Sequence, residues 1–485
     1  MKSSRVHQRS VRSSVAALTA LLLVASSCGR DDSAATTTSA PPPSSSAAPS
    51  SSAATGETSS TAAGSPSSSS GETTTAAPAV AGPGDFGNLK AICGPGDANG
   101  STDQGVTDGE IVVGTAADPG NTVIPGMGQE MIDAGKVFVE WCNAAGGIKG
   151  RKLKLNIHDA KLFDVGPAMI EACQTDFVLV GVGLALDAAG VEPRTACKLP
   201  QIAAYTVSPQ AGRSEGSIEA LSNSDTSSWG SLVYLSLMEK DPEVLKHVAF
   251  WGPALPSTVP TLKREVAALK QLGFDAADYQ ETPTQVDNWR PFVEKLKEVG
   301  VQLLVLNNTG SALVPVLKAM ADVGYFPKYI TSPAIYEERL VKEAGAELDQ
   351  TIVLPETKLV PFELADTHPS TKQFVELMRK QGGLLKSLSV NSFTAWLLFA
   401  KAAGECGSEL TRACVLEKAT AVKDWTGGGL HRPSEPGPTS GPPSQCSAIL
   451  RATSKGFSVA TDIYTPNTDG IFKCDPKIAM VIPNA

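Results

Sequence analysis

Histidine is scarce in this chain, and the motifs that usually accompany catalysis are missing. There are five histidines among 485 residues, and they are scattered. No CxxC pair occurs, which leaves a metal site little support. No GxxxxGK[ST] or HExxH stretch is present, and the glycines of VGVGLALD do not complete GxGxxG. We therefore expect no metal, no cofactor and no catalytic residues.

Positive charge is also in short supply. The formal net charge is −9, and four positive charges lie at Lys2, Arg5, Arg9 and Arg12. A chain that has lost this first segment would carry about −13, and an acidic chain of this kind repels nucleic acid. We expect no nucleic-acid partner.

The N-terminus has the layout of a secretory signal. Its basic residues precede the apolar run VAALTALLLVA, which is too short to span a bilayer as a permanent helix. We predict that residues 1–27 form a signal peptide. The small residues before Cys28 resemble a bacterial lipobox, which predicts lipidation of Cys28 and anchoring to the outer face of the cytoplasmic membrane. Ordinary secretion without a lipid is the alternative.

Residues 28–84 consist almost wholly of Ser, Thr, Ala, Pro and Gly. This composition cannot build a core, so it predicts a disordered tether. A tether of this length has a root-mean-square span on the order of 40 Å. No second stretch of the chain is long and apolar enough to cross a membrane.

Strand and helix patterns alternate after the tether. EIVVGTAAD predicts a buried strand, Gln129–Ala145 an amphipathic helix that stops at Gly146-Gly147, and KLKLNIHDA a second strand. The loop from Pro119 to Gly128 would lie at the carboxyl end of the first strand, where open α/β sheets bind ligands. About 400 residues exceed what one core usually organises, so we expect two lobes.

The nine cysteines indicate disulfides in an exported chain. If Cys28 is lipidated, eight remain, and eight cysteines allow 105 connectivities. We expect one disulfide between the ends of two consecutive helices, one across a short interhelical loop and one between two terminal strands. The two remaining cysteines would form the fourth. The pairs are Cys142 with Cys173, Cys406 with Cys414, Cys446 with Cys474, and Cys93 with Cys197.

The stretches GVTDGEIVVG and NAAGGIKGRKL give the chain a specific resemblance. From about Gly105 to the C-terminus it resembles the type I periplasmic solute-binding proteins, in the branch of the branched-chain amino-acid binders of ABC importers. The resemblance implies an α/β fold of two Rossmann-like lobes, with parallel central sheets, three crossover strands and a ligand cleft between the lobes. It places the first lobe at 85–223 and 356–428, and the second at 224–355 and 429–485.

The resemblance also implies a ligand site at the carboxyl ends of the strands. In the first lobe the candidates are Asn121, Asp187, Tyr205, Thr206 and Ser208. In the second lobe they are Trp251, Asn307, Thr309, Ser332 and Tyr336. Tyr205 has an alternative role as a rim aromatic packed on its own lobe, and Trp251 one in packing between the lobes.

The usual ligand of the resembled family does not fit well. Its amino-acid binders hold the ligand's α-ammonium with an acidic residue just after the strand that corresponds to KYITSP. Pro333 stands there in this chain, and Glu337 and Glu338 follow a few residues on. An ammonium buried without an anionic partner is costly. We therefore expect an apolar or aromatic molecule, an amide or a carboxylate, held by Trp251, Tyr205 and Tyr336.

Together these features predict the substrate-binding lipoprotein of an ABC importer, a monomer that captures a small molecule and delivers it to a membrane permease. A ligand-sensing lipoprotein that signals to a membrane receptor is an alternative. An exported hydrolase is a further alternative, for which His158 and His247 are the histidines to examine.

Overall fold

Two β-sheets, one parallel and one mixed with a parallel core, are flanked by helices and organise the part of the chain that the computed structural model describes. This part comprises residues 82–221, 228–255, 258–274, 278–438 and 444–482. The predicted signal peptide, the lipidation at Cys28 and nearly all of the predicted tether lie outside the described residues and stay predictions. In the described part, no helix has the length and apolar character needed to cross a membrane.

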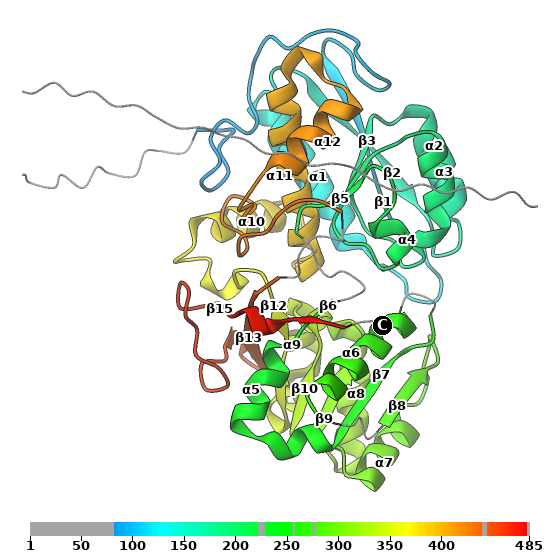
Figure 1. Cartoon of the computed structure of the whole chain (residues 1–485), viewed down its shortest axis with the longest axis vertical. Coiled ribbons are helices and arrows are strands. Elements are labelled where there is room, and N and C mark those ends of the chain that lie inside the picture. Colours follow the sequence, from blue (N-terminus) through cyan, green and yellow to red (C-terminus); the bar gives the residue numbers. More distant parts are fainter. Residues whose placement is uncertain (1–81, 222–227, 256–257, 275–277, 439–443, 483–485) are drawn as a thin grey trace, which may run out of the picture. The chain divides into compact units, whose positions relative to one another are not determined.

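The first sheet has the strand order β2-β1-β3-β4-β5, and all its neighbouring strands are parallel (Figure 1). Its strands are β1 (Glu110–Ala117), β2 (Lys152–Asp159), β3 (Val178–Val182), β4 (Gln201–Ala203) and β5 (Ser217–Glu219). The connecting helices are α1 (Gln129–Ala145), α2 (Val165–Thr175), η1 (Asp187–Gly190), α3 (Val191–Ala196) and α4 (Pro209–Gly212). The predicted βαβ unit is confirmed.

Helix α1 has the bounds that the sequence predicted, because glycine defines both of its ends. Gly128 at its N-cap has φ 75° and Gly146 at its C-cap has φ 122°, in the region that glycine adopts without strain. A Cβ at Gly146 would lie 2.5 Å from the backbone nitrogen of Pro95. The N-terminal segment of the described chain therefore packs closely against the end of α1.

The second sheet has the order β12-β13-β11-β10-β9-β7-β8, with β14 and β15 paired to β13. Its parallel part comprises β7 (Val248–Pro253), β8 (Asp278–Thr282), β9 (Leu303–Leu306), β10 (Tyr329–Thr331) and β11 (Ile352–Leu354). Strands β12 (Glu356–Thr357), β14 (Gly456–Val459) and β15 (Lys473–Cys474) are antiparallel to β13 (Cys446–Thr453). A separate ribbon pairs β6 (Ser228–Gly230) with β16 (Ala479–Val481). The second sheet is therefore a mixed sheet.

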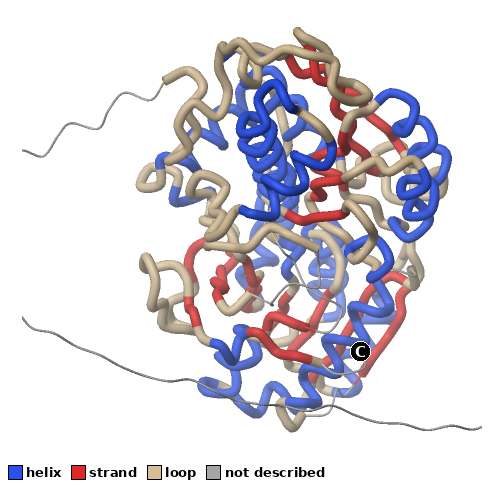
Figure 2. The backbone as a smooth tube through the Cα atoms, turned by 45° about the horizontal axis from the view of Figure 1, so that its top comes forward, coloured by secondary structure: helices blue, strands red, loops and turns tan. Residues whose placement is uncertain are grey.

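Helices alternate with the strands of the second sheet, as the tube in Figure 2 shows. They are α5 (Leu232–Lys240), η2 (Pro242–Lys246), α6 (Thr258–Gln271), α7 (Arg290–Val299), α8 (Gly310–Val323), η3 (Pro333–Ile335), α9 (Glu338–Ala344) and η4 (Gly345–Gln350). Its core includes Phe250, Leu262, Leu303 and Tyr329.

The chain then returns to the first sheet through η5 (Phe362–Leu364), α10 (Pro369–Lys380), α11 (Ser387–Cys406), η6 (Gly407–Glu409) and α12 (Arg412–Ala421). Helix α11 packs on α1, where the ring of Trp396 stacks on Phe138 at a centroid distance of 5.6 Å. After α12 the chain enters the second sheet at β13; η7 (Pro476–Ile478) precedes β16.

Three crossover segments join the two sheets. Glu219, the last residue of β5, forms a backbone bridge with Gly437 of the last segment, and Leu359 of the middle segment forms one with His431 of the last. The middle and last segments therefore lie side by side, and the last also contacts the end of β5. The residue boundaries of the lobes, as given by the resemblance, stay predictions.

The structure confirms two of the expected disulfides, Cys406–Cys414 and Cys446–Cys474, and shows that the other two expected pairs are wrong. Cys93 pairs with Cys142, and Cys173 pairs with Cys197. The backbone N–H of Gly94 donates to the carbonyl of Gly147 at 2.6 Å, which holds Cys93 beside the end of α1. The path of this N-terminal segment decides the pairing, and no local pattern in the sequence indicates it.

Peptide mapping without reduction should recover Cys93 linked to Cys142 and Cys173 linked to Cys197. Replacing both Cys93 and Cys142 with Ser should lower the free energy of unfolding by about 4 kcal/mol, because their separation of 49 residues closes a long loop in the unfolded chain. Replacing both Cys406 and Cys414, which are eight residues apart, with Ser should lower the free energy of unfolding by less, ~2–3 kcal/mol. Urea unfolding measures both losses. A peptide that links Cys142 to Cys173 would contradict this pairing.

Candidate ligand-binding site

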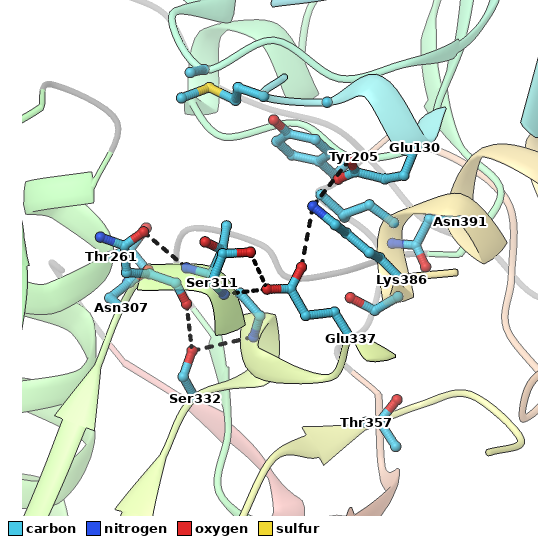
Figure 3. A pocket seen from close by; sticks show the side chains of 18 of the residues that line it. Glu130, Tyr205, Thr261, Asn307, Ser311, Ser332, Glu337, Thr357, Lys386 and Asn391 are labelled. Carbon is cyan, nitrogen blue, oxygen red and sulfur yellow. Dashed lines mark hydrogen bonds and ion pairs between the residues drawn. The ribbon is translucent and has the colours of Figure 1, made fainter. Parts of the chain in front are cut away.

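A cavity of about 940 Å³ lies where loops from both sheets and the crossover segments meet. Its wall includes residues that follow β1, β4, β7, β9 and β10, together with part of the second crossover and the start of α11. The carboxyl ends of parallel strands are where open α/β sheets place ligands, and the volume suits a small organic molecule. Figure 3 shows part of this wall.

The loop after β4 carries three of the predicted site residues, Tyr205, Thr206 and Ser208, and all three line the cavity. Two acidic side chains hold this loop. The carboxylate of Asp187 accepts hydrogen bonds from the backbone N–H groups of Val207, at 2.6 Å, and Ser208. Oε1 of Glu219 accepts the backbone N–H of Thr206 at 2.6 Å and its hydroxyl at 2.8 Å. The loop is therefore fixed in place before any ligand arrives.

The second sheet contributes Asn307, Thr309 and Ser332, which also line the cavity as the sequence placed them. The Thr309 hydroxyl accepts the backbone N–H of Ala312 and caps α8. The Ser332 hydroxyl accepts the N–H of Ala334 at 3.2 Å. Both hydroxyls are thus partly engaged by their own loops. The contact of all six lining residues with a ligand stays a prediction.

Trp251 and Tyr336 do not line the cavity, so the structure gives them a different role from the predicted one. Trp251 is fully buried and stacks on Trp289 at a centroid distance of 5.9 Å, within the second lobe. Tyr336 donates its hydroxyl to Glu363 at 2.9 Å and accepts the backbone N–H of Phe362 at 2.6 Å. Position at the end of a strand fixes the edge of the sheet but not the face to which a side chain points.

Asn121 and Asp187 are also absent from the cavity wall and support loops instead. Asn121 is 2% exposed, and its Oδ1 accepts the backbone N–H of Val123 at 2.8 Å. The carboxylate of Asp187 is turned toward the backbone of the loop after β4. Burial raises the pKa of Asp187, against the opposing effect of the hydrogen bonds from Ser208 and Val207. Both side chains therefore bond to loop backbone and do not line the cavity.

The sequence analysis missed a cluster of three charged side chains on the cavity wall. Nζ of Lys386 lies 3.1 Å from Oε2 of Glu337 and 3.5 Å from Oε2 of Glu130. Figure 3 shows the lysine side chain between the two carboxylates. Burial is the main cause that raises the pKa of Glu130. Burial also acts to lower the pKa of Lys386, but the two carboxylates outweigh it and raise the value.

Only Glu337 in this cluster had a signal in the sequence, since it follows the strand KYITSP. Glu130 reads as an ordinary first-turn acid of α1, and Lys386 as a residue before a helix. Their meeting depends on tertiary packing.

Neither of the histidines considered for a hydrolase reaches the cavity. Nε2 of His158 lies 2.7 Å from the buried carboxylate of Asp176, within the first lobe. His247 precedes β7, and no histidine is among the described residues that line the cavity. The described residues also contain no group of three or more His, Cys, Asp or Glu side chains placed to hold a metal ion.

The model of the family described as "Periplasmic binding protein" matches residues 123–457 of the sequence. The chain belongs to the periplasmic binding protein family. The resemblance seen in the sequence is thereby confirmed, and so is the α/β architecture with its two sheets.

Solved structures show the same fold. A fatty acid ABC transporter substrate-binding protein from Thermomonospora curvata is 17% identical, with a TM-score of 0.61 over 79% of this chain and 95% of that one. A leucine-binding protein from Thermotoga maritima is 12% identical, with a TM-score of 0.59 over 72% and 97%. A branched-chain amino acid transporter substrate-binding protein from Streptococcus pneumoniae, in complex with isoleucine, is 13% identical, with a TM-score of 0.57 over 72% and 98%. A search of curated protein sequences found no significant match.

A buried acid on the cavity wall makes a pH dependence testable. Glu265 on α6 is 1% exposed, and burial raises its pKa from 4.5 to about 8, although Arg264 opposes the shift. The folded state therefore binds this proton more tightly than the unfolded state, so stability is lost as the pH rises from 4.5 through 8. Replacing Glu265 with Gln removes this loss, which is on the order of a few kcal/mol.

Urea unfolding at pH 5 and pH 8 measures the effect of Glu265→Gln. The variant should gain stability over the wild type at the higher pH and little at the lower. Glu239→Gln, which removes an exposed acid on α5, is the control and should change neither value. An equal change for Glu265→Gln at both pH values would contradict the assignment.

Proposed function

We propose that the protein is the extracytoplasmic substrate-binding lipoprotein of an ABC importer. It captures one small solute by closure of its lobes and delivers it to a membrane permease. The observation that carries the proposal is the cavity itself, which is walled by strand ends from both sheets in a chain of the periplasmic binding protein family. Contact with both sheets gives a ligand extra affinity for the closed arrangement, and such differential affinity is what drives closure.

The ligand is a small molecule with an apolar body and a carboxylate or amide group. Much of the cavity wall is apolar, with Ile124, Met127, Leu221, Val233, Leu255, Leu385 and Leu388 among its residues. Tyr205, Thr206 and Asn307 bring a hydroxyl or an amide to the same wall. A few placed polar groups in an apolar wall orient a ligand of this kind. The solved structures with this fold include the substrate-binding proteins of a fatty acid ABC transporter and of a branched-chain amino acid transporter.

Lipidation at Cys28 and a tether over 28–84 would hold the binding lobes at the membrane, close to the permease. We expect a monomer, because one chain supplies both halves of the cavity.

Intact-mass measurement of membrane-extracted protein should find an acylated N-terminal Cys28. A mature chain without an acyl group would remove the anchor from the proposal but leave the ligand site in place.

A thermal-shift screen of the protein from about Gly82 onward tests the function. The library contains carboxylates, amides, amino acids and sugars. A ligand at ~100 times its dissociation constant should add ~2.7 kcal/mol to the free energy of unfolding. Mass spectrometry should then return the hit chemically unchanged. Conversion of the hit during incubation would support the hydrolase instead and contradict the proposal.

Asn307→Ala should weaken binding of such a hit about tenfold, because removal of one hydrogen-bonding partner costs ~1–3 kcal/mol. Calorimetric titration measures the change. Asn288→Ala is the matched control, since Asn288 is exposed and does not line the cavity. Equal affinities for wild type and Asn307→Ala would place the ligand elsewhere.

A further inference from the structure

Three charged side chains from distant parts of the sequence meet at one wall of the cavity. Glu130 belongs to the first turn of α1, Glu337 directly precedes α9, and Lys386 directly precedes α11. The lysine ammonium contacts one carboxylate oxygen of each acid, at 3.1 Å for Glu337 and 3.5 Å for Glu130. Figure 3 shows Lys386 pointing to the place where the two carboxylates converge.

Both carboxylates are buried, so each requires a nearby cation to offset the loss of hydration of its charge. Glu130 is 4% exposed and Glu337 is 1% exposed. Among the described residues, Oε2 of neither acid accepts a hydrogen bond of good geometry, and each has the Lys386 ammonium as its ion-pair partner. Removing a charge from water without a partner is costly, so a cation here contributes strongly to the folded state.

The other oxygen of Glu337 is held in place by the second lobe. Oε1 accepts hydrogen bonds from the backbone N–H and the hydroxyl of Ser311, the latter at 2.7 Å. The carboxylate therefore presents Oε2 in a fixed direction, toward the ammonium. This fixed oxygen and the buried Oε2 of Glu130 together form a receptor for a single ammonium group.

The backbone around Lys386 keeps its ammonium at this receptor. Glu337 and Lys386 form an antiparallel backbone bridge, and the N–H of Ser387 donates to the carbonyl of Tyr336 at 3.3 Å. The carbonyl of Lys386 accepts the hydroxyl of Ser389 at 2.6 Å. Because the lysine stem starts from a fixed point, its ammonium has a high effective concentration at the carboxylates, and an ammonium from a free molecule has to displace it.

We propose that Glu130 and Glu337, the latter oriented by Ser311, form an ammonium subsite that Lys386 fills from within the chain, so that the cavity accepts ligands without a cationic group. This specificity rests on the proposed binding function, whereas the subsite itself does not. Lys386 is then a specificity-determining residue, because it excludes amines and α-amino acids.

Chemical rescue of Lys386→Ala tests the subsite. The substitution removes three methylene groups and the ammonium, which n-propylammonium replaces atom for atom. We expect Lys386→Ala to unfold at a lower temperature than the wild type, and n-propylammonium chloride to raise its midpoint by a few degrees above the effect of equal sodium chloride. The wild type should show no such rise, because its subsite is occupied.

Two further variants separate the subsite from general effects of the amine. Lys401→Ala removes a lysine from α11 that pairs with Glu405 on the surface, and it should not respond to n-propylammonium. The double variant Lys386→Ala with Glu337→Gln should lose most of the response, since one of the two carboxylates is gone. An equal response in wild type and Lys386→Ala, or none in Lys386→Ala, would overturn the proposal.

If Lys386→Ala does not fold, Lys386→Met keeps the unbranched stem, one atom shorter, and removes the charge. Adding Glu337→Gln to Lys386→Met should then raise the unfolding midpoint, because it removes a buried charge that has lost its partner. A lower midpoint for this double variant would also overturn the subsite. All these measurements use ligand-free protein, so a failed ligand screen leaves the subsite standing. An absent amine response overturns the subsite and leaves the proposed transport function standing.

Discussion

Parallel strands end at a common edge, and this constraint determines where the protein can bind a ligand. Each sheet carries its loops at the carboxyl ends of its parallel strands, and the three crossover segments bring both sets of loops to one cavity. The long return from α10 through α12 adds α11 to the first lobe and places Lys386 at the cavity wall. Chain topology therefore determines where the cavity lies, and the particular side chains determine only its chemistry.

In our proposal, charged side chains on the wall then limit which ligands the cavity accepts. Its wall holds several buried ionisable groups. Among them, Glu130, Lys386 and Glu337 come from three distant elements and pair directly. A buried ion pair contributes little net stability compared with apolar packing, but its separated parts are costly. Such a cluster therefore serves specificity better than stability, which agrees with its place beside a ligand cavity.

The sequence predicted what depends on local pattern and missed what depends on tertiary approach. The βαβ unit and the end of α1 at Gly146 follow from periodicity and glycine placement, and the cavity position of Tyr205 follows from the family resemblance. The sequence does not predict the direction in which the side chains of Trp251 and Tyr336 point, because a residue at the end of a strand can face either side of the sheet. The partners of Cys93 and Cys173 depend on the path of the N-terminal segment and on the packing of α2 against α3. The short strands β5 and β8 carry too little pattern to be recognised.

Calorimetric titration with leucine and with 4-methylpentanoate tests the central claim most directly, because the two molecules differ only in the ammonium group. A cavity whose ammonium subsite is filled by Lys386 should bind 4-methylpentanoate more tightly than leucine by about tenfold or more, equivalent to at least ~1.4 kcal/mol. The opposite order, with leucine bound more tightly, would show that the subsite is open to a ligand's ammonium and would contradict the account.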